Sequence, residues 1–157
     1  MAATLSSLSA RVRDLLADGA ADLWGDPAVS EALRLALGEY TLAAQVHAPG
    51  APAVTLSGLD GAPSTSLPEA HETLIVLGAA GYAAQMRAVD RAGLHDEGAE
   101  SRLLADWGSR RLGEYKTMLA ALFPVHHGDD AARLAELRAS TNPTWGLWVE
   151  DDRCQPE

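Results

Sequence analysis

The stretch TLIVLGAAGYAAQM, residues 73–86, is the most apolar part of this 157-residue chain. Pro68 can open a helix before it and Gly93 can end one after it, so the sequence predicts a helix from residue 68 to about residue 92. Charged residues stand only near the two ends of that helix. A helix that is apolar on every side must be buried on every side, so this segment decides how the rest of the chain packs around it.

Two environments can bury such a helix. Three other helices of a chain this short can scarcely enclose it, so we expect a second copy of the chain to cover part of it. The residues expected at this subunit interface are Leu74, Ile75, Val76, Gly78, Ala79, Tyr82 and Met86. The alternative is a central helix buried inside a single chain.

Apolar residues at helical spacing predict two helices before the central one. The first runs over about residues 4–17, and Gly19 ends it. The second runs over about residues 26–46. Asp26 can accept a backbone N–H as its N-cap, and Pro27 suits the first helical position because a missing N–H costs nothing there.

A fourth helix is predicted over about residues 97–123, with an apolar face and an opposite face of alternating charge. The connection at residues 47–67 is rich in Pro, Gly, Ser and Thr, and its length is unusual for a small domain. Residues 54–56 suggest a short strand or hairpin there, and Asp-Gly at residues 60–61 is a turn signal. The predicted fold is therefore an all-α bundle with one long loop.

The C-terminal part is expected to be different in character. A short fifth helix, capped by Asp129 or Asp130, should end near Arg138. Pro143 and Gly146 then exclude a helix, so we divide the chain into a helical domain at residues 1–140 and an extended arm at residues 141–157. Exposed tryptophans are unfavourable, so the arm is expected to dock on a partner or on its own domain. The residues expected to dock are Trp145, Leu147, Trp148 and Val149.

Composition limits the function. The chain has 12 basic and 22 acidic residues, a formal net charge of -10, which argues against binding nucleic-acid phosphates or an anionic membrane as its main task. Its single cysteine excludes an intrachain disulfide framework. The apolar run at residues 73–86 is shorter than the roughly 20 residues that cross a bilayer. We therefore expect a soluble protein of a reducing compartment, with no membrane partner.

No motif predicts catalysis or a cofactor. The sequence lacks a nucleophile elbow, a phosphate-binding loop and a dinucleotide fingerprint. The run HHGDD at residues 126–130 contains metal-ligand types, but adjacent histidines point in different directions and an aspartate that caps a helix explains it more simply. His47, His71 and His95 are scattered. We expect no enzyme activity, cofactor or bound metal.

The order of several short motifs resembles the small helical head–tail connector, or adaptor, proteins of tailed bacteriophages. These motifs are LWGD at residues 23–26, ALxxALxEY at residues 32–40, LP at residues 67–68 and WxxxRLxxY at residues 107–115. With the small-residue-rich helix between the last two, the resemblance covers most of residues 4–123.

The resemblance implies a structural protein of the virion neck, assembled in the cytoplasm of the bacterial host. Such adaptors form rings, commonly of twelve copies, beneath the portal protein. The ring extends the DNA channel, lets DNA pass without sequence-specific binding, and carries the next neck or tail-completion protein. The arm at residues 141–152 would then dock on the portal.

Two other functions are compatible with the sequence. A cytosolic helical metal protein or enzyme would use His126, His127, Asp129 or His47. A small oligomeric regulator would bind a partner helix through residues 73–86.

Overall fold

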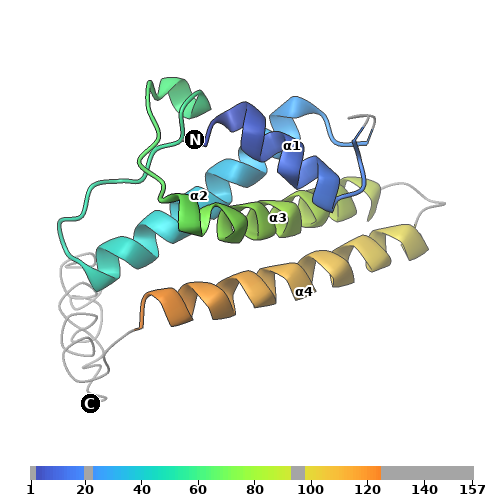
Figure 1. Ribbon diagram of the computed structural model, residues 1–157. Helices are drawn as coiled ribbons and strands as arrows, with labels where there is room; N and C mark the ends of the chain where they lie inside the picture. The colour runs from blue at the N-terminus through green and yellow to red at the C-terminus, as the bar shows by residue number, and fades with distance from the viewer. Residues whose placement is uncertain (1–2, 20–22, 93–97, 125–157) are drawn as a thin grey trace, which may run out of the picture. The chain divides into compact units, whose positions relative to one another are not determined.

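Four α-helices and two short 3-10 helices make up residues 3–19, 23–92 and 98–124, which the computed structural model describes (Figure 1). The elements are α1 (Leu5–Leu15), α2 (Asp26–His47), η1 (Leu59–Gly61), η2 (Glu69–His71), α3 (Glu72–Ala92) and α4 (Gly98–Leu122). The prediction of an all-α fold with four main helices is confirmed. The predicted fifth helix, the arm and the domain boundary after residue 140 lie outside the described residues.

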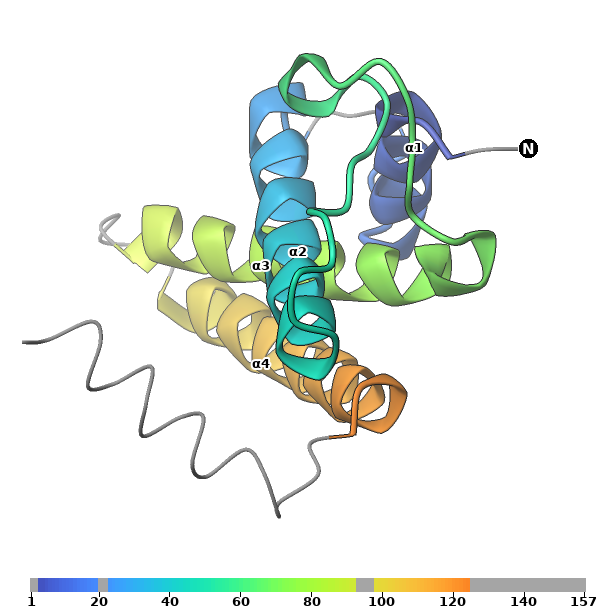
Figure 2. The same ribbon diagram turned by 90° about the vertical axis from the view of Figure 1, so that its left-hand side faces the viewer.

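α3 is the helix against which the other three pack. α4 runs antiparallel beside it, and both α1 and α2 contact it as well (Figures 1 and 2). The fully buried side chains come from all four helices and from the loop before η1; the largest are Leu8, Val12, Val29, Leu33, Leu56, Ile75 and Tyr115. Full burial of one such side chain contributes about 1.5–3 kcal/mol, so the core around α3 supplies most of the stabilisation.

Glycines bring α3 and α4 into close contact. A Cβ atom at Gly78 would lie 2.9 Å from Cδ2 of Tyr115, and one at Gly81 would lie 2.8 Å from Cγ of Leu112. In α4, a Cβ atom at Gly108 would lie 2.9 Å from the backbone oxygen of Gly81. We call Gly78, Gly81 and Gly108 the glycine seam. Because these three positions carry no side chain, α4 can approach α3 closely enough to cover it. A larger residue at any of them would displace a neighbour.

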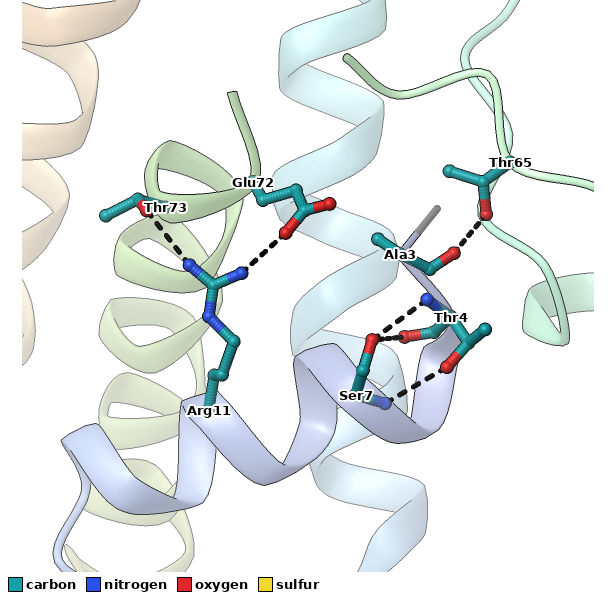
Figure 3. Close-up of polar contacts among 7 residues, drawn as sticks. All are labelled: Ala3, Thr4, Ser7, Arg11, Thr65, Glu72 and Thr73. Atoms are coloured by element: carbon teal, nitrogen blue, oxygen red, sulfur yellow. Dashed lines mark hydrogen bonds and ion pairs between the residues drawn. The ribbon is translucent and has the colours of Figure 1, made fainter. Parts of the chain in front are cut away.

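α1 begins near the predicted residue and ends earlier than predicted. Oγ1 of Thr4 accepts the backbone N–H of Ser7 at 3.2 Å, and Oγ of Ser7 accepts the N–H of Thr4 at 2.9 Å, a reciprocal cap (Figure 3). At the other end Ala17, with φ 55°, takes the left-handed conformation two residues before Gly19, the residue predicted to end the helix. The backbone N–H of Asp18 already bonds back into the last turn, so the helix has closed before it reaches the glycine.

Polar contacts attach α1 to its surroundings (Figure 3). The guanidinium of Arg11 donates to Oε2 of Glu72 at 2.7 Å and to Oγ1 of Thr73 at 2.9 Å. The hydroxyl of Thr65 donates to the backbone oxygen of Ala3. Both the start of α3 and the long loop are therefore anchored to the N-terminal helix.

The starts of α2 and α3 differ from the prediction by a few residues. Gly25, and not Asp26, is the N-cap of α2, so Asp26 and Pro27 occupy the first two helical positions. The Asp26 carboxylate pairs with Arg13 instead of capping, and a negative charge in the first turn also suits the helix dipole. η2 forms directly after Pro68, so α3 begins four residues later than the proline.

The loop between α2 and α3 contains no strand, contrary to the suggestion at residues 54–56. The described residues hold only an isolated bridge between Thr4 and Ser57. Side chains take the hydrogen bonds that a partner strand would make: the N–H of Ser57 donates to Oγ1 of Thr65, and that of Thr55 to Oγ of Ser66. Three leucines of the loop are buried, namely Leu56, Leu59 and Leu67. The predicted turn at residues 60–61 is present within η1.

Candidate functional site

The residues predicted to form a subunit interface are mostly covered by their own chain. Five of them are buried: Leu74, Ile75, Val76, Gly78 and Ala79. The other two, Tyr82 and Met86, are half-buried and pack against the core. The expectation that a second copy must cover this helix is wrong, because the glycine seam lets α4 cover the side of α3 that α1 and α2 leave open. The alternative of a central helix inside one chain describes it correctly.

Tyrosine hydroxyls connect the helices around α3. The hydroxyl of Tyr115 donates to the backbone oxygen of Ala36 at 2.7 Å, and that of Tyr82 donates to Oε2 of Glu39 at 2.8 Å. Burial raises the pKa of Tyr82 to about 12, and it also raises the pKa of Tyr115. These phenols stay protonated at neutral pH and act as hydrogen-bond donors that tie α3 and α4 to α2.

α2 presents an apolar face that the described residues of the chain leave exposed. We call it the α2 outer face, and its members are Leu35, Gly38, Leu42 and Val46. Positions seven and eleven residues apart return to nearly the same side of a helix, so the three larger residues form one stripe. Leu42 is 61% exposed, and nothing lies within 4 Å of a Cβ atom placed on Gly38.

Two acidic residues accompany this stripe. Glu31 and Glu39 stand one helical turn before and after Leu35. Glu31 pairs with Arg34, and Glu39 lies 3.5 Å from the Lys116 ammonium. The α2 outer face is therefore apolar along its centre and carries carboxylates at its edge.

A second apolar surface is a shallow groove between the end of α1 and the first turns of α4. Its volume is about 370 Å³, and we call it the α1–α4 groove; it is lined by Leu15, Leu16, Ala17, Trp24, Glu100, Leu103, Leu104 and Trp107. Leu103 is 70% exposed. The single acidic residue among the lining side chains, Glu100, pairs with Arg91.

Arginines stand beside both tryptophans of the groove. The Arg87 guanidinium lies 5.0 Å from the ring centre of Trp24, and that of Arg111 lies 5.3 Å from the ring centre of Trp107. Such cation–π contacts hold the guanidinium groups close to the apolar lining. Both guanidinium groups have further partners in the chain, since Arg111 pairs with Glu114 and Arg87 donates to the backbone oxygen of Leu23.

Hydrogen bonds fix the wall of the groove. The buried carboxylate of Asp18 accepts the backbone N–H of Leu23 at 3.0 Å and that of Trp24 at 2.9 Å. The Trp24 indole N–H donates to the backbone oxygen of Ala83 at 3.4 Å. A buried indole held on α3 in this way gives the groove its shape before any partner binds.

The two surfaces lie toward opposite ends of the helical unit. Ring contacts of Phe123 with Tyr40, at 5.3 Å, and with His47, at 5.9 Å, place the C-terminal end of α2 beside the end of α4. The groove instead includes Leu103, twenty residues earlier in α4, which is about 30 Å along a helix. The two surfaces are therefore separate.

Another hollow, between α1, the first turn of α2 and the loop, is polar. It has a volume of about 610 Å³, and its lining includes the hydroxyls of Ser6, Ser9, Ser30 and Ser57 together with Arg13 and Asp26. The two charged residues already pair with each other. Nothing in this arrangement resembles a nucleophile with its general base.

The remaining predicted sites are only partly described. Within residues 3–19, 23–92 and 98–124, no group of three His, Cys, Asp or Glu side chains could hold a metal ion. His71 places Nδ1 2.6 Å from the Tyr40 hydroxyl. The HHGDD run at residues 126–130 lies outside the described part of the chain, as do His95, Trp145, Leu147, Trp148 and Val149.

Neither exposed surface was among the sites predicted from the sequence. A signal for the α2 outer face is present in the sequence, since Leu35, Leu42 and Val46 share a side that differs from the side of Leu33 and Tyr40. No comparable signal marks the groove, because α1 and α4 contribute to it from distant parts of the chain.

No helix in the described part of the chain combines the length and the apolar composition that crossing a membrane requires. No family model, curated protein or solved structure matches this chain.

Proposed function

We propose that this chain is a head–tail connector of a tailed bacteriophage, a non-enzymatic neck protein that forms a ring below the portal. The order of its motifs along residues 4–123 resembles that family, and the all-α fold is of the kind the resemblance implies. Ring number, commonly twelve in such adaptors, belongs to the proposal.

The observation that carries the proposal is the pair of separate apolar surfaces on a unit whose core is already covered. A head-to-tail contact uses two different surfaces of each copy, and it closes into a ring when the rotation between copies permits. The α2 outer face and the α1–α4 groove satisfy this requirement, since they lie on different elements and at different ends.

The charge of the chain suits a channel wall. With a net charge of -10, copies arranged around a channel would repel DNA phosphates rather than hold them. DNA could then pass without a sequence-specific contact. Binding that tracks the backbone would need a basic surface and would weaken steeply with salt.

The C-terminal arm supplies the proposed contact with the portal. Two tryptophans within four residues, Trp145 and Trp148, offer large apolar side chains of the kind that dominate protein interfaces. The next neck or tail-completion protein would bind the opposite end of the ring.

Electron microscopy and light scattering of the purified chain, alone and with a portal protein of the same genome, test the proposal. We expect closed rings, or rings that form on the portal. A variant lacking residues 141–157 should keep the ring contact and lose the portal. Monomers under both conditions would overturn the proposal, and so would flanking genes unrelated to virion assembly.

A further inference from the structure

We infer that the polar hollow between α1, the first turn of α2 and the loop binds the phosphate group of a small phosphomonoester. We call it the serine hollow. It is formed by three parts of the chain that lie side by side (Figures 1 and 2). Its polar lining includes Ser6, Ser9, Ser30, Ser57, Arg13 and Asp26. The inference goes beyond the proposed ring and does not depend on it.

Hydroxyl groups that are free to bind a ligand line this hollow. Ser9 is only 8% exposed, yet its hydroxyl makes no hydrogen bond within the described part of the chain. The hydroxyls of Ser6 and Ser30, which are less buried, make none there either. A buried hydroxyl without a partner costs free energy. A ligand that accepts hydrogen bonds from these groups removes that cost.

Arg13 brings a positive charge to the wall of the hollow. Its side chain is 13% exposed, and its buried Nε–H group has no hydrogen-bond partner among the described residues. One terminal nitrogen of the guanidinium pairs with Asp26, whose side chain is 87% exposed. Ion pairs with such an exposed partner contribute little to stability. The carboxylate can therefore turn into solvent and leave the guanidinium to an incoming anion.

These groups favour an anion over a cation. Asp26 is the single acid among the described residues of the lining, and one carboxylate is too few for a cation that needs several oxygen ligands. A guanidinium beside several hydroxyls is a donor set that suits phosphate oxygens. The start of α2, where Gly25 offers no capping side chain, adds the positive end of a helix dipole.

The size of the hollow points to a small ligand with an organic part. Its volume of about 610 Å³ is more than a phosphate group fills, and small-molecule pockets commonly measure roughly 300–1,000 Å³. Leu5, Ala10 and Gly58 provide apolar lining beside the serines. A long polyanion such as DNA is disfavoured by the net charge of -10, which acts over its whole length.

Calorimetric titration of the full chain at constant ionic strength tests the inference. The probes are glycerol 3-phosphate, glycerol as the matched uncharged compound, and inorganic phosphate. We expect glycerol 3-phosphate to bind, glycerol not to bind, and inorganic phosphate to bind more weakly than the ester. Absence of binding by glycerol 3-phosphate overturns the inference. Equal or tighter binding of inorganic phosphate overturns the assignment of an organic part.

Variants at the ion pair give a sharper test, because the two changes should act in opposite directions. Arg13→Gln should weaken binding of glycerol 3-phosphate at least about tenfold, since it removes charged hydrogen bonds. Asp26→Asn should strengthen binding severalfold, since the competing carboxylate is lost. Arg110→Gln, at an exposed arginine of α4, is the matched control and should bind as the wild type does.

Circular dichroism and urea unfolding check that each variant is folded. Ser9→Ala, which removes one hydroxyl and suits a helix, should also weaken binding and supplies a test should Arg13→Gln fail to fold. If Arg13→Gln binds as the wild type does, or if Asp26→Asn does not bind more tightly, the ion pair is only structural and the inference fails.

Discussion

α3 and α2 are nearly equal in length, 21 and 22 residues, and both are rich in apolar side chains. They differ in how far those side chains are buried. Residues 74–84 of α3 are almost completely enclosed by their own chain, whereas α2 leaves Leu35, Leu42 and Val46 exposed. The apolar content of a helix therefore does not tell whether a partner is needed. What decides it is how closely the neighbouring helices can approach.

The sharpest test places one substitution in each helix. Gly81→Ala puts a methyl group 2.8 Å from Leu112 Cγ and 3.1 Å from its backbone nitrogen, whereas the methyl of Gly38→Ala enters open space. Overpacking costs about 1–3 kcal/mol, and replacing a helical glycine by alanine otherwise gains about 0.5–1 kcal/mol. Urea unfolding should show that Gly81→Ala lowers the free energy of unfolding and that Gly38→Ala raises it. Equal effects at the two sites would mean that the seam is not tight.

A smaller effect on stability is expected from the hydrogen bond that links α4 to α2. Tyr115→Phe removes the hydroxyl that donates to the backbone oxygen of Ala36. A buried hydrogen bond contributes about 1 kcal/mol, so the free energy of unfolding should fall by that amount while the ring still fills the space beside Gly78. Thr117→Val, which removes an exposed hydroxyl of the same helix, is the control and should change stability less.

Alkaline pH should weaken the link between α2 and α3. The pKa of Tyr82 is raised from 10.0 to about 12, so above pH 10 the unfolded chain loses this proton while the folded chain keeps it. Stability is therefore fully present below pH 10 and declines as the pH rises toward 12. The three tyrosines of the chain can be followed by phenolate absorbance. Tyr82→Phe should show a shallower decline; an unchanged slope would contradict the assignment.

The smallest effect is expected on the exposed side of α2. Leu42→Ala should change the free energy of unfolding at low protein concentration by no more than about 0.5 kcal/mol, as surface substitutions usually do. A loss comparable with that of a buried leucine, about 2–5 kcal/mol, would show that α2 is covered within one chain and would remove the contrast with α3.

The sequence was sufficient to predict the helices but not their neighbours. Apolar spacing and the residues Thr4, Pro27 and Pro68 located the four helices to within a few positions. The error over α3 arose because Gly78 and its apolar neighbours were interpreted as contacts with another copy. Whether a glycine contacts Tyr115 of its own chain or a side chain of a partner depends on tertiary packing. The residues next to the glycine in the sequence do not determine that packing.

The same reasoning explains the loop and the candidate surfaces. Val54 and its neighbours have strand propensity, but their backbone bonds to serine and threonine side chains and not to a partner strand. This tertiary context overrides the propensity. The α2 outer face could be predicted from helical periodicity. The α1–α4 groove could not, because it exists only when residues about 80 positions apart, such as Leu15 and Leu103, come together.

The glycine seam also limits how the unit can move. Sliding α4 along α3 by one turn, about 5.4 Å, would carry Tyr115 away from Gly78 and Leu112 away from Gly81, so both close contacts would be lost. The close contacts at the glycine seam therefore favour one register of α4 along α3. If the proposed ring forms, a change of its shape is therefore expected to come from rotation of whole units about their contacts rather than from sliding within this helix pair.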